Sequence, residues 1–176
     1  MSSVSSVREG QRVGVRVEPD ARLVVQTWLG TRLLLLIVAA VVALSSHTSL
    51  ARVLGNWDVL HFVAIARDGY AVATDVAFFP GLPLLLRVGV LVGVDPVLWG
   101  TVLAIVTSAL ATWALYRLGG RWAAIAWLLA PTSVFTLVPY SESPFCAAAF
   151  WAWEHARHRK WGPAAACAAA ACTLRV

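Results

Sequence analysis

Long apolar runs separated by short polar breaks constrain this chain more than any other feature. The runs cover residues 33–44, 97–116, 122–138 and 144–154, and a last run begins at Pro163. Of all residues, 60% are hydrophobic and 13% are charged, whereas soluble domains carry about 25% charged residues. One core cannot bury so much apolar surface, so lipid must solvate much of the chain. We therefore predict an all-α polytopic membrane protein with about five transmembrane helices and external juxtamembrane helices.

Arginines lie at the ends of the apolar runs. They form no basic face and no nucleic-acid motif, so the net charge of +5 favours cytoplasmic loops over nucleic-acid binding. Residues 1–22 are polar and arginine-rich and lack a signal-peptide cleavage pattern. We predict a disordered cytoplasmic tail over 1–22 and a membrane domain over 23–176. Arg32 directly precedes the first predicted membrane helix, Leu33–Leu44, and places the N-terminus inside.

The predicted external segment covers residues 47–95, and its second half poses the main topology question. The run 78–94 is apolar but short, contains Pro80 and Pro83, and has Arg87 near its middle. A charge at the centre of a spanning helix costs about 2.5–3.5 kcal/mol on insertion scales. We expect 78–94 to stay at the external face.

Charge placement supports the same topology. Arg117–Arg121 and Arg157–Lys160 both belong in the cytoplasm by the positive-inside rule. The run 97–116 then supplies the single crossing between the external segment and Arg117. If 78–94 does span, Tyr140–Ser143 falls inside instead.

A short helix is predicted within the external segment, with Asn56 as its N-cap, Trp57 as its first residue and Gly69 at its end. Its spacing predicts one apolar face, made of Trp57, Leu60, Val63 and Ala64. Such a helix is typical of a segment that lies on the membrane surface.

Asp58 is the first candidate for chemistry, since it begins this helix at the membrane–water boundary. A carboxylate there can act as a general base close to a lipid substrate. The structural alternative is that Asp58 only caps the helix and Trp57 only anchors it. His61 offers a second acid–base group or simple packing. Arg67 and Asp68 suggest a solvated ion pair.

Three further patterns are candidates. Phe79-Pro80-Gly81-x-Pro83 predicts either a backbone break beside a cavity or a plain helix start. Glu142, in the polar break 139–143, predicts either a cavity-facing acid or an exposed turn. Arg175 lies in an apolar run, where it suits a phosphate, an ion pair with Glu142 or Asp58, or a snorkelling end charge.

Three blocks of this sequence resemble the PIG-V family of mannosyltransferases, polytopic enzymes of the C-type glycosyltransferase superfamily. The blocks are WDVLHFVAIARDGY (57–70), AFFPGLPLLLR (77–87) and APTSVFTLVPYSESPF (130–145). The ending Thr173-Leu174-Arg175 is similar to the start of the family's next motif. The resemblance covers about residues 30–176, which corresponds to the N-terminal part of a typical member, so we expect the native chain to continue past Val176.

The resemblance implies transfer of mannose from a polyprenyl- or dolichyl-phosphate donor to a lipid-linked or other extracytoplasmic acceptor. Eukaryotic members build GPI anchors, whereas the arginine- and alanine-rich composition here suggests a bacterial plasma membrane. By analogy Asp58 is the catalytic carboxylate. The residues predicted to contact substrate are Trp57, His61, Arg67, Tyr70, Arg87, Tyr140, Glu142 and Arg175.

We predict no tightly bound metal, because no acidic cluster has metal-ligand spacing, and no cofactor besides the lipid-phosphate-linked sugar as co-substrate. Two other functional classes remain open. A transporter or channel would use Glu142, Arg87 and Arg175 to line a path. An inactive fragment with a scaffold role is the third hypothesis.

Overall fold

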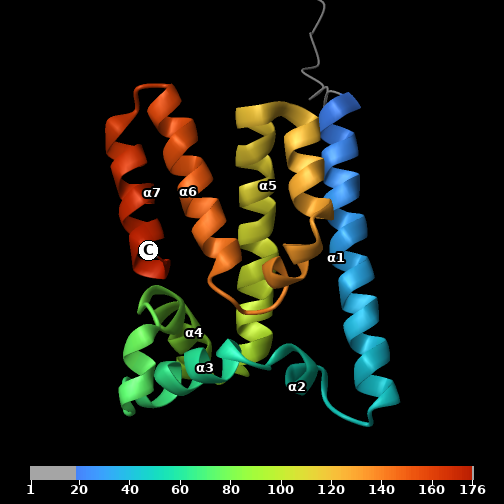
Figure 1. Ribbon diagram of the computed structural model, residues 1–176, viewed down its shortest axis with the longest axis vertical. Helices are drawn as coiled ribbons and strands as arrows, with labels where there is room; N and C mark the ends of the chain where they lie inside the picture. The colour runs from blue at the N-terminus through green and yellow to red at the C-terminus, as the bar shows by residue number, and fades with distance from the viewer. Residues whose placement is uncertain (1–18, 176) are drawn as a thin grey trace, which may run out of the picture.

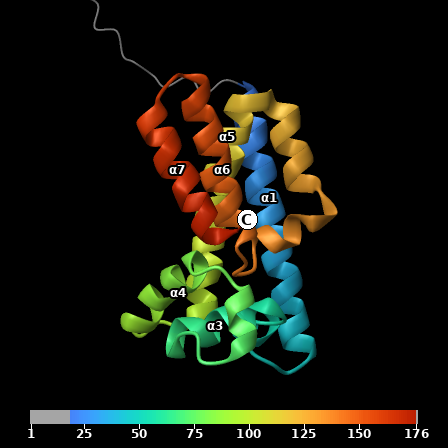
Figure 2. The same ribbon diagram turned by 60° about the vertical axis from the view of Figure 1, so that its left-hand side comes forward.

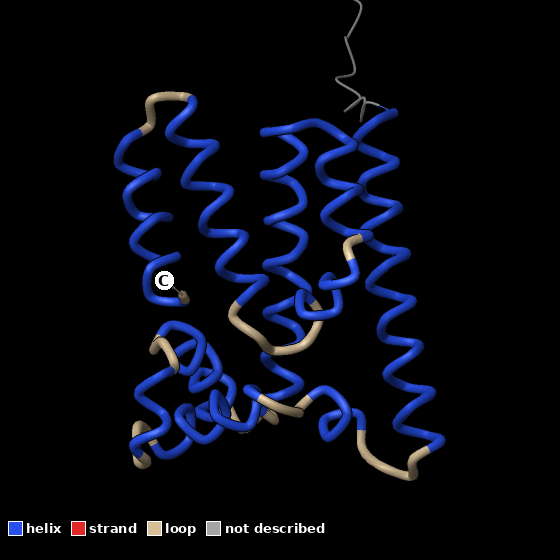
Figure 3. Tube along the Cα trace, viewed as in Figure 1, coloured by secondary structure: helices blue, strands red, loops and turns tan. Residues whose placement is uncertain are grey.

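The computed structural model describes residues 19–175, and every regular element in this part of the chain is a helix (Figures 1 and 3). The prediction of an all-α chain is confirmed for these residues. The α-helices are α1 (Pro19–Ser45), α2 (Leu50–Leu54), α3 (Asp58–Asp68), α4 (Gly81–Leu91), α5 (Pro96–Leu129), α6 (Glu142–Arg157) and α7 (Trp161–Leu174). Two 3₁₀ helices join them, η1 (Ala73–Ala77) and η2 (Pro131–Thr136).

Helix α1 begins earlier than the sequence indicated. Pro19 occupies its first position, where the missing N–H costs nothing, and Asp20 lies in its first turn. The predicted tail over 1–22 is therefore wrong for residues 19–22, and residues 1–18 lie outside the described part. At 27 residues α1 is about 40 Å long. It exceeds the roughly 30 Å of bilayer hydrocarbon.

Arg32 does not flank α1 as predicted but lies in its middle. Its side chain is buried, with 3% exposed. The Nη1 atom donates a hydrogen bond of 2.6 Å to Thr136 Oγ1 on η2. Nε and Nη2 have no hydrogen-bond partner among residues 19–175. Because Arg32 precedes the apolar run 33–44, the sequence predicted a charge at the end of a membrane helix. The helix instead begins at Pro19, so Arg32 lies inside it.

Helix α5 contains a sharp reversal. Gly120 has φ +76° and ψ −175° within it, and this backbone conformation favours glycine. In Figure 1 the chain turns over at this point and returns beside α1. The apolar runs 97–116 and 122–138 thus become two antiparallel arms. The second arm is helical only to Leu129, because Pro131 follows and cannot continue the helix.

The ends of the bundle differ in the elements they carry. The start of α1, the reversal in α5 and the α6–α7 turn lie at one end, and α2, α3 and α4 gather at the other (Figures 1 and 2). We call the end with the start of α1 the basic end, and the end with α2, α3 and α4 the site end. Two described helices, Asp20–Ser45 and Pro96–Leu129, are long and apolar enough to cross a membrane. The count of five spans stays a prediction.

Ion pairs fix the basic end. Arg117 Nε lies 2.6 Å from Glu154 Oε1, joining α5 to α6. Glu154 is buried and also faces His158 Nε2 at 3.2 Å. Arg121 pairs with Asp20, which joins α5 to α1. The arginines that predicted a cytoplasmic side therefore also hold the helices together.

The segment 78–94 contains a short helix at the site end, and its place outside the bilayer stays a prediction. Helix α4 has 11 residues and is about 16 Å long, half of the hydrocarbon thickness. Pro80 is its N-cap and Pro83 lies in its first turn, so the Phe-Pro-Gly pattern is a plain helix start. The backbone of Thr173 approaches α4 closely at Gly81. A Cβ atom at this position would lie 2.6 Å from the carbonyl oxygen of Thr173, so only glycine fits.

Helix α3 confirms the predicted end at Gly69, but the predicted cap is wrong. Trp57, with φ +55°, occupies the N-cap position. The side chain of Asn56 instead donates hydrogen bonds to the carbonyls of Arg52 and Val53, at 3.1 and 2.9 Å. It satisfies the end of α2, whose last carbonyls have no helical partners.

The apolar face that the spacing predicts, with Trp57 and Leu60, points outward, and α3 buries a second apolar face. The core contains Val59, Phe62, Ile65 and Ala66, whereas Trp57 is 75% and Leu60 64% exposed. Both faces of α3 are apolar, so spacing alone did not decide which one packs on α4. The outward apolar face is the one a membrane surface would contact. Contact of the outward face with a membrane surface stays a prediction.

Candidate functional site

A buried core at the site end brings distant parts of the chain together. It joins α3, α4, the loop between η2 and α6, and the end of α7. Its buried members are Val59, Phe62, Ala66, Leu82, Leu86, Tyr140 and Leu174. Tyr140 belongs to this core and lies near the carboxylates of both Asp58 and Glu142, so it connects the start of α3 to the start of α6.

Asp58 is the first residue of α3 and is exposed. It lies close to Tyr140, which is only 7% exposed. Burial raises the pKa of Tyr140, and the nearby Asp58 carboxylate raises it further, while a hydrogen bond with the Asp58 backbone acts in the opposite direction. A carboxylate open to solvent therefore stands next to a buried phenol.

Glu142 and Arg175 form an ion pair, one of the two pairings that the sequence suggested for Arg175. Arg175 Nη1 donates to Glu142 Oε1 over 2.7 Å, joining the start of α6 to the end of α7. Both side chains are partly exposed, so the pair stabilises the fold by about 0–1 kcal/mol. Glu142 Oε2 is buried and accepts no hydrogen bond within residues 19–175, so one carboxylate oxygen remains able to accept one.

His61 has a partner that sequence reasoning missed. Its Nδ1 lies 3.3 Å from Oδ1 of Asp75 in η1, and the Asp75 side chain is buried. The imidazole also stacks on Phe78, with 4.8 Å between ring centroids. The available signal was a single acid in the apolar stretch before Phe-Phe-Pro, but its burial depends on how η1 folds over α3.

The remaining predicted residues lie around two hollows. Tyr70 donates a 2.8 Å hydrogen bond to the carbonyl of Phe78 and lines a hollow of 360 Å³ with Phe79 and Pro80. Burial raises the pKa of Tyr70, and Asp75 adds to this effect. An adjoining hollow of 180 Å³ is lined by Tyr70, Pro80 and Arg87 among others.

Trp57 and Arg67 are exposed on α3. The ion pair expected between Arg67 and Asp68 is absent within the described residues. Adjacent residues on a helix point in different directions, so they rarely pair. The structure thus groups Asp58, Tyr140, Glu142 and Arg175, and it leaves Arg67 outside this group.

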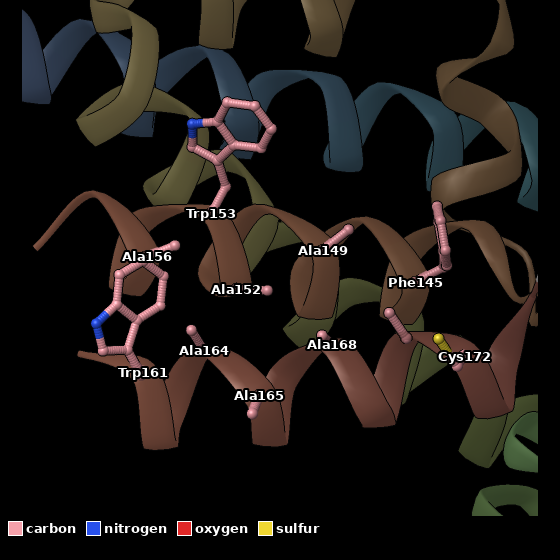
Figure 4. A pocket seen from close by; sticks show the side chains of 11 residues that line it. Phe145, Ala149, Ala152, Trp153, Ala156, Trp161, Ala164, Ala165, Ala168 and Cys172 are labelled. Carbon is pink, nitrogen blue, oxygen red and sulfur yellow. The ribbon is translucent and has the colours of Figure 1, made fainter. Parts of the chain in front are cut away.

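A hollow of 640 Å³ runs between α6 and α7 (Figure 4). Alanines, indole rings and Phe145 line it, and its lining contains no charged residue. Phe145 and Cys172 lie at one end of it (Figure 4). Each is one helical turn from a member of the Glu142–Arg175 pair, so the apolar groove ends beside charged groups.

The site end contains four groups that could take part in chemistry. They are the exposed carboxylate of Asp58, the buried phenol of Tyr140, the Glu142–Arg175 ion pair and the His61 imidazole beside Asp75. No three His, Cys, Asp or Glu side chains within residues 19–175 are placed to hold a metal ion. Such groups can accept a proton from a hydroxyl group and can stabilise a developing negative charge.

A family model described as Mannosyltransferase (PIG-V) matches residues 31–174. The chain belongs to the PIG-V mannosyltransferase family. All three sequence blocks lie inside the matched range. No solved structure matches the chain.

The curated relatives that resemble this PIG-V chain are also named as mannosyltransferases. GPI alpha-1,6-mannosyltransferase 2 of Homo sapiens is 34% identical over 128 residues, which covers 61% of this chain and 26% of the relative. The Mus musculus protein of the same name gives the same values. GPI mannosyltransferase 2 of Chaetomium globosum is 30% identical over 129 residues, covering 58% of this chain and 27% of the relative. The chain thus spans about a quarter of the length of these relatives.

Proposed function

We infer that this chain is part of a membrane mannosyltransferase. It would move mannose from a polyprenyl- or dolichyl-phosphate donor to a lipid-linked or other acceptor outside the cytoplasm. The observation that carries the proposal is that Tyr140 lies near both Asp58 and Glu142, and that Glu142 pairs with Arg175. Family membership supports the sugar.

The chemistry would need few groups. Asp58 accepts the proton of the acceptor hydroxyl while that oxygen attacks the anomeric carbon of the sugar. The bond from this carbon to the phosphate oxygen breaks, and the electron pair leaves with the phosphate. A cation at the site stabilises the departing charge.

The arrangement of the helices supports a topology for this reaction. Arg117, Arg121 and the segment Arg157–Lys160 belong to the turns at the basic end. The positive-inside rule would place this end in the cytoplasm, with the site end outside it. The proposal includes five crossings, with α2, α3 and α4 at the external face of a bacterial plasma membrane.

The α6–α7 groove supports a lipid-linked substrate. It is apolar along its length and ends one turn from Glu142 and Arg175. A lipid chain in the bilayer could lie in such a groove while its head group reaches the charged end. The transporter alternative is less well supported, because Arg87 lines a different hollow from the one that ends at Glu142 and Arg175.

The test is transfer of radiolabelled mannose from polyprenyl-phosphate mannose, measured in membranes that contain the full-length protein. Asp58→Asn should lower transfer at least about 100-fold, since general bases contribute about 10²–10⁴. Asp68→Asn is the matched control, because Asp68 is an exposed carboxylate at the other end of α3. Equal transfer by Asp58→Asn and the unmodified protein, at equal insertion, would overturn the assignment.

A further inference from the structure

Asp75 is a buried carboxylate that the reaction described above does not use. Its side chain is 2% exposed. One oxygen, Oδ2, accepts a long hydrogen bond of 3.4 Å from the backbone N–H of Val72. The other, Oδ1, faces His61 Nδ1 at 3.3 Å. Burying a carboxylate is costly unless it is paired, so the imidazole is the partner that makes this position tenable.

Asp75 and Phe78 together fix the orientation of His61. The ring stacks on Phe78 at an interplanar angle of 16°, and Phe78 in turn packs edge-on against Phe62. A carboxylate accepts only, so Nδ1 must carry the proton that it donates to Asp75. Nε2 then has no partner among the described residues, and the side chain is 46% exposed.

His61 and Asp58 are neighbours on one helix. Residues three apart on a helix lie on the same side, with about 5–6 Å between their Cβ atoms. The two groups differ in their surroundings: Asp58 is an exposed carboxylate, whereas one edge of the His61 ring lies against the buried Asp75 carboxylate. A carboxylate can accept a proton and a ring N–H can donate a hydrogen bond, so the two side chains can serve different parts of one substrate.

Glycosyl transfer from a phosphate needs both kinds of group, a base for the attacking hydroxyl and a donor for the leaving oxygen. Arg175 is the donor that the sequence suggested. However, Glu142 already accepts a hydrogen bond from it and offsets its charge. The exposed Nε2 edge of His61 has no hydrogen-bond partner within residues 19–175, so it is a second candidate donor beside Asp58.

We propose that His61 binds the phosphate of a polyprenyl-phosphate substrate through Nε2–H, and that Asp75 is its positioning residue. The proposal rests on the transferase function stated above. In the step, the acceptor oxygen bonds to the anomeric carbon as its proton passes to Asp58. The bond between that carbon and the phosphate oxygen breaks, and the electron pair remains on an oxygen that His61 holds by a hydrogen bond.

Binding of polyprenyl phosphate, with the uncharged polyprenol as the head-group control, tests this directly. The protein is held in lipid nanodiscs of phosphatidylcholine. His61→Gln should weaken binding of the phosphate about tenfold, the loss expected for one charge-assisted hydrogen bond, and should leave binding of polyprenol unchanged. His61→Lys, which keeps a cation but is a poor base, should retain most of the affinity.

His47→Gln is the matched control, since His47 is an exposed histidine in the turn after α1 at the same end. A ¹⁵N spectrum of the imidazoles adds a readout of position. His61 should be protonated at Nδ1, and Asp75→Asn should remove this preference and weaken phosphate binding severalfold.

Unchanged phosphate affinity in His61→Gln would overturn the proposal. So would equal losses for phosphate and polyprenol, which would indicate a merely structural role. Binding is measured without sugar transfer, so the two proposals can fail separately. If the unmodified protein transfers no mannose, the proposed function is contradicted, while the effect of His61→Gln on phosphate binding is unaffected.

Discussion

The two ends of the bundle both contain acid–base pairs, but they use them differently. At the basic end, buried Glu154 accepts from Arg117 and also faces His158, so its charge is well compensated. At the site end, Asp58 is exposed. Within residues 19–175, one oxygen of Glu142 and the Nε2 edge of His61 have no hydrogen-bond partner. Groups whose bonds are complete stabilise a fold, whereas groups with unused bonding capacity can bind a ligand. The comparison indicates that one end holds the helices and the other carries the chemistry.

The largest expected effect concerns the side of the membrane from which each end can be labelled. Single cysteines at Ser46 and Gly162, in a chain whose native cysteines are replaced by alanine, should react with an impermeant maleimide from opposite sides of the membrane. Both positions are exposed, and a Cβ at Gly162 meets no atom within 4 Å. Labelling of intact cells only at Ser46→Cys is the expected pattern. Labelling of both from one side would contradict the two-ended arrangement.

Arg117→Gln should cause the next largest effect, on stability. It leaves Glu154 buried without its main partner, and breaking a buried pair costs about 3–5 kcal/mol, less where one partner is hydrated. Arg117 is 45% exposed, so we expect a loss of about 2–3 kcal/mol in unfolding by denaturing detergent. Arg157→Gln is the control, because Arg157 is exposed and donates to the carbonyl of Leu118. Equal stability of the two variants would show that the pair is dispensable.

Arg32 lies between the two ends, and its replacement should have a smaller and opposite effect. Arg32→Met removes a buried cation and one hydrogen bond to Thr136. Replacing buried charges by apolar residues of similar size is often neutral or stabilising by about 1–4 kcal/mol. We expect the free energy of unfolding to stay equal or to rise. A loss greater than about 2 kcal/mol would indicate that the guanidinium fixes η2 against α1.

The pair at the site end should matter least for stability. Arg175→Gln should change the free energy of unfolding by no more than about 1 kcal/mol, because the pair is partly exposed. Mannose transfer should nevertheless fall, since Arg175 lies at the charged end of the α6–α7 groove, where the head group of the proposed lipid-linked substrate would lie. A large loss of stability with unchanged transfer per folded molecule would reverse the contrast between the ends.

Much of this arrangement could be predicted from apolar runs and charge. The helical class and the end of α3 at Gly69 followed from hydrophobicity and the position of glycine. The Glu142–Arg175 pair was one of the alternatives that the placement of charges offered. Local patterns of this kind depend on a few neighbouring residues.

What could not be predicted depends on tertiary packing. Both faces of α3 are apolar, so only contact with α4 decides that Phe62 is buried and Leu60 exposed. Arg32 resembled an end charge because nothing before it marks the helix as continuing to Pro19. Asp75 gave no local sign of burial, since its environment is created by η1 folding over His61.

The central claim is that chemistry resides at the site end and structural pairing at the basic end. Mannose transfer per folded molecule, compared between Asp58→Asn and Arg117→Gln in the full-length protein, tests this most directly. Asp58→Asn should keep the stability of the unmodified protein and lose transfer, whereas Arg117→Gln should lose stability and keep transfer per folded molecule. Normal transfer by Asp58→Asn, or a transfer defect in folded Arg117→Gln of the same size, would contradict the account.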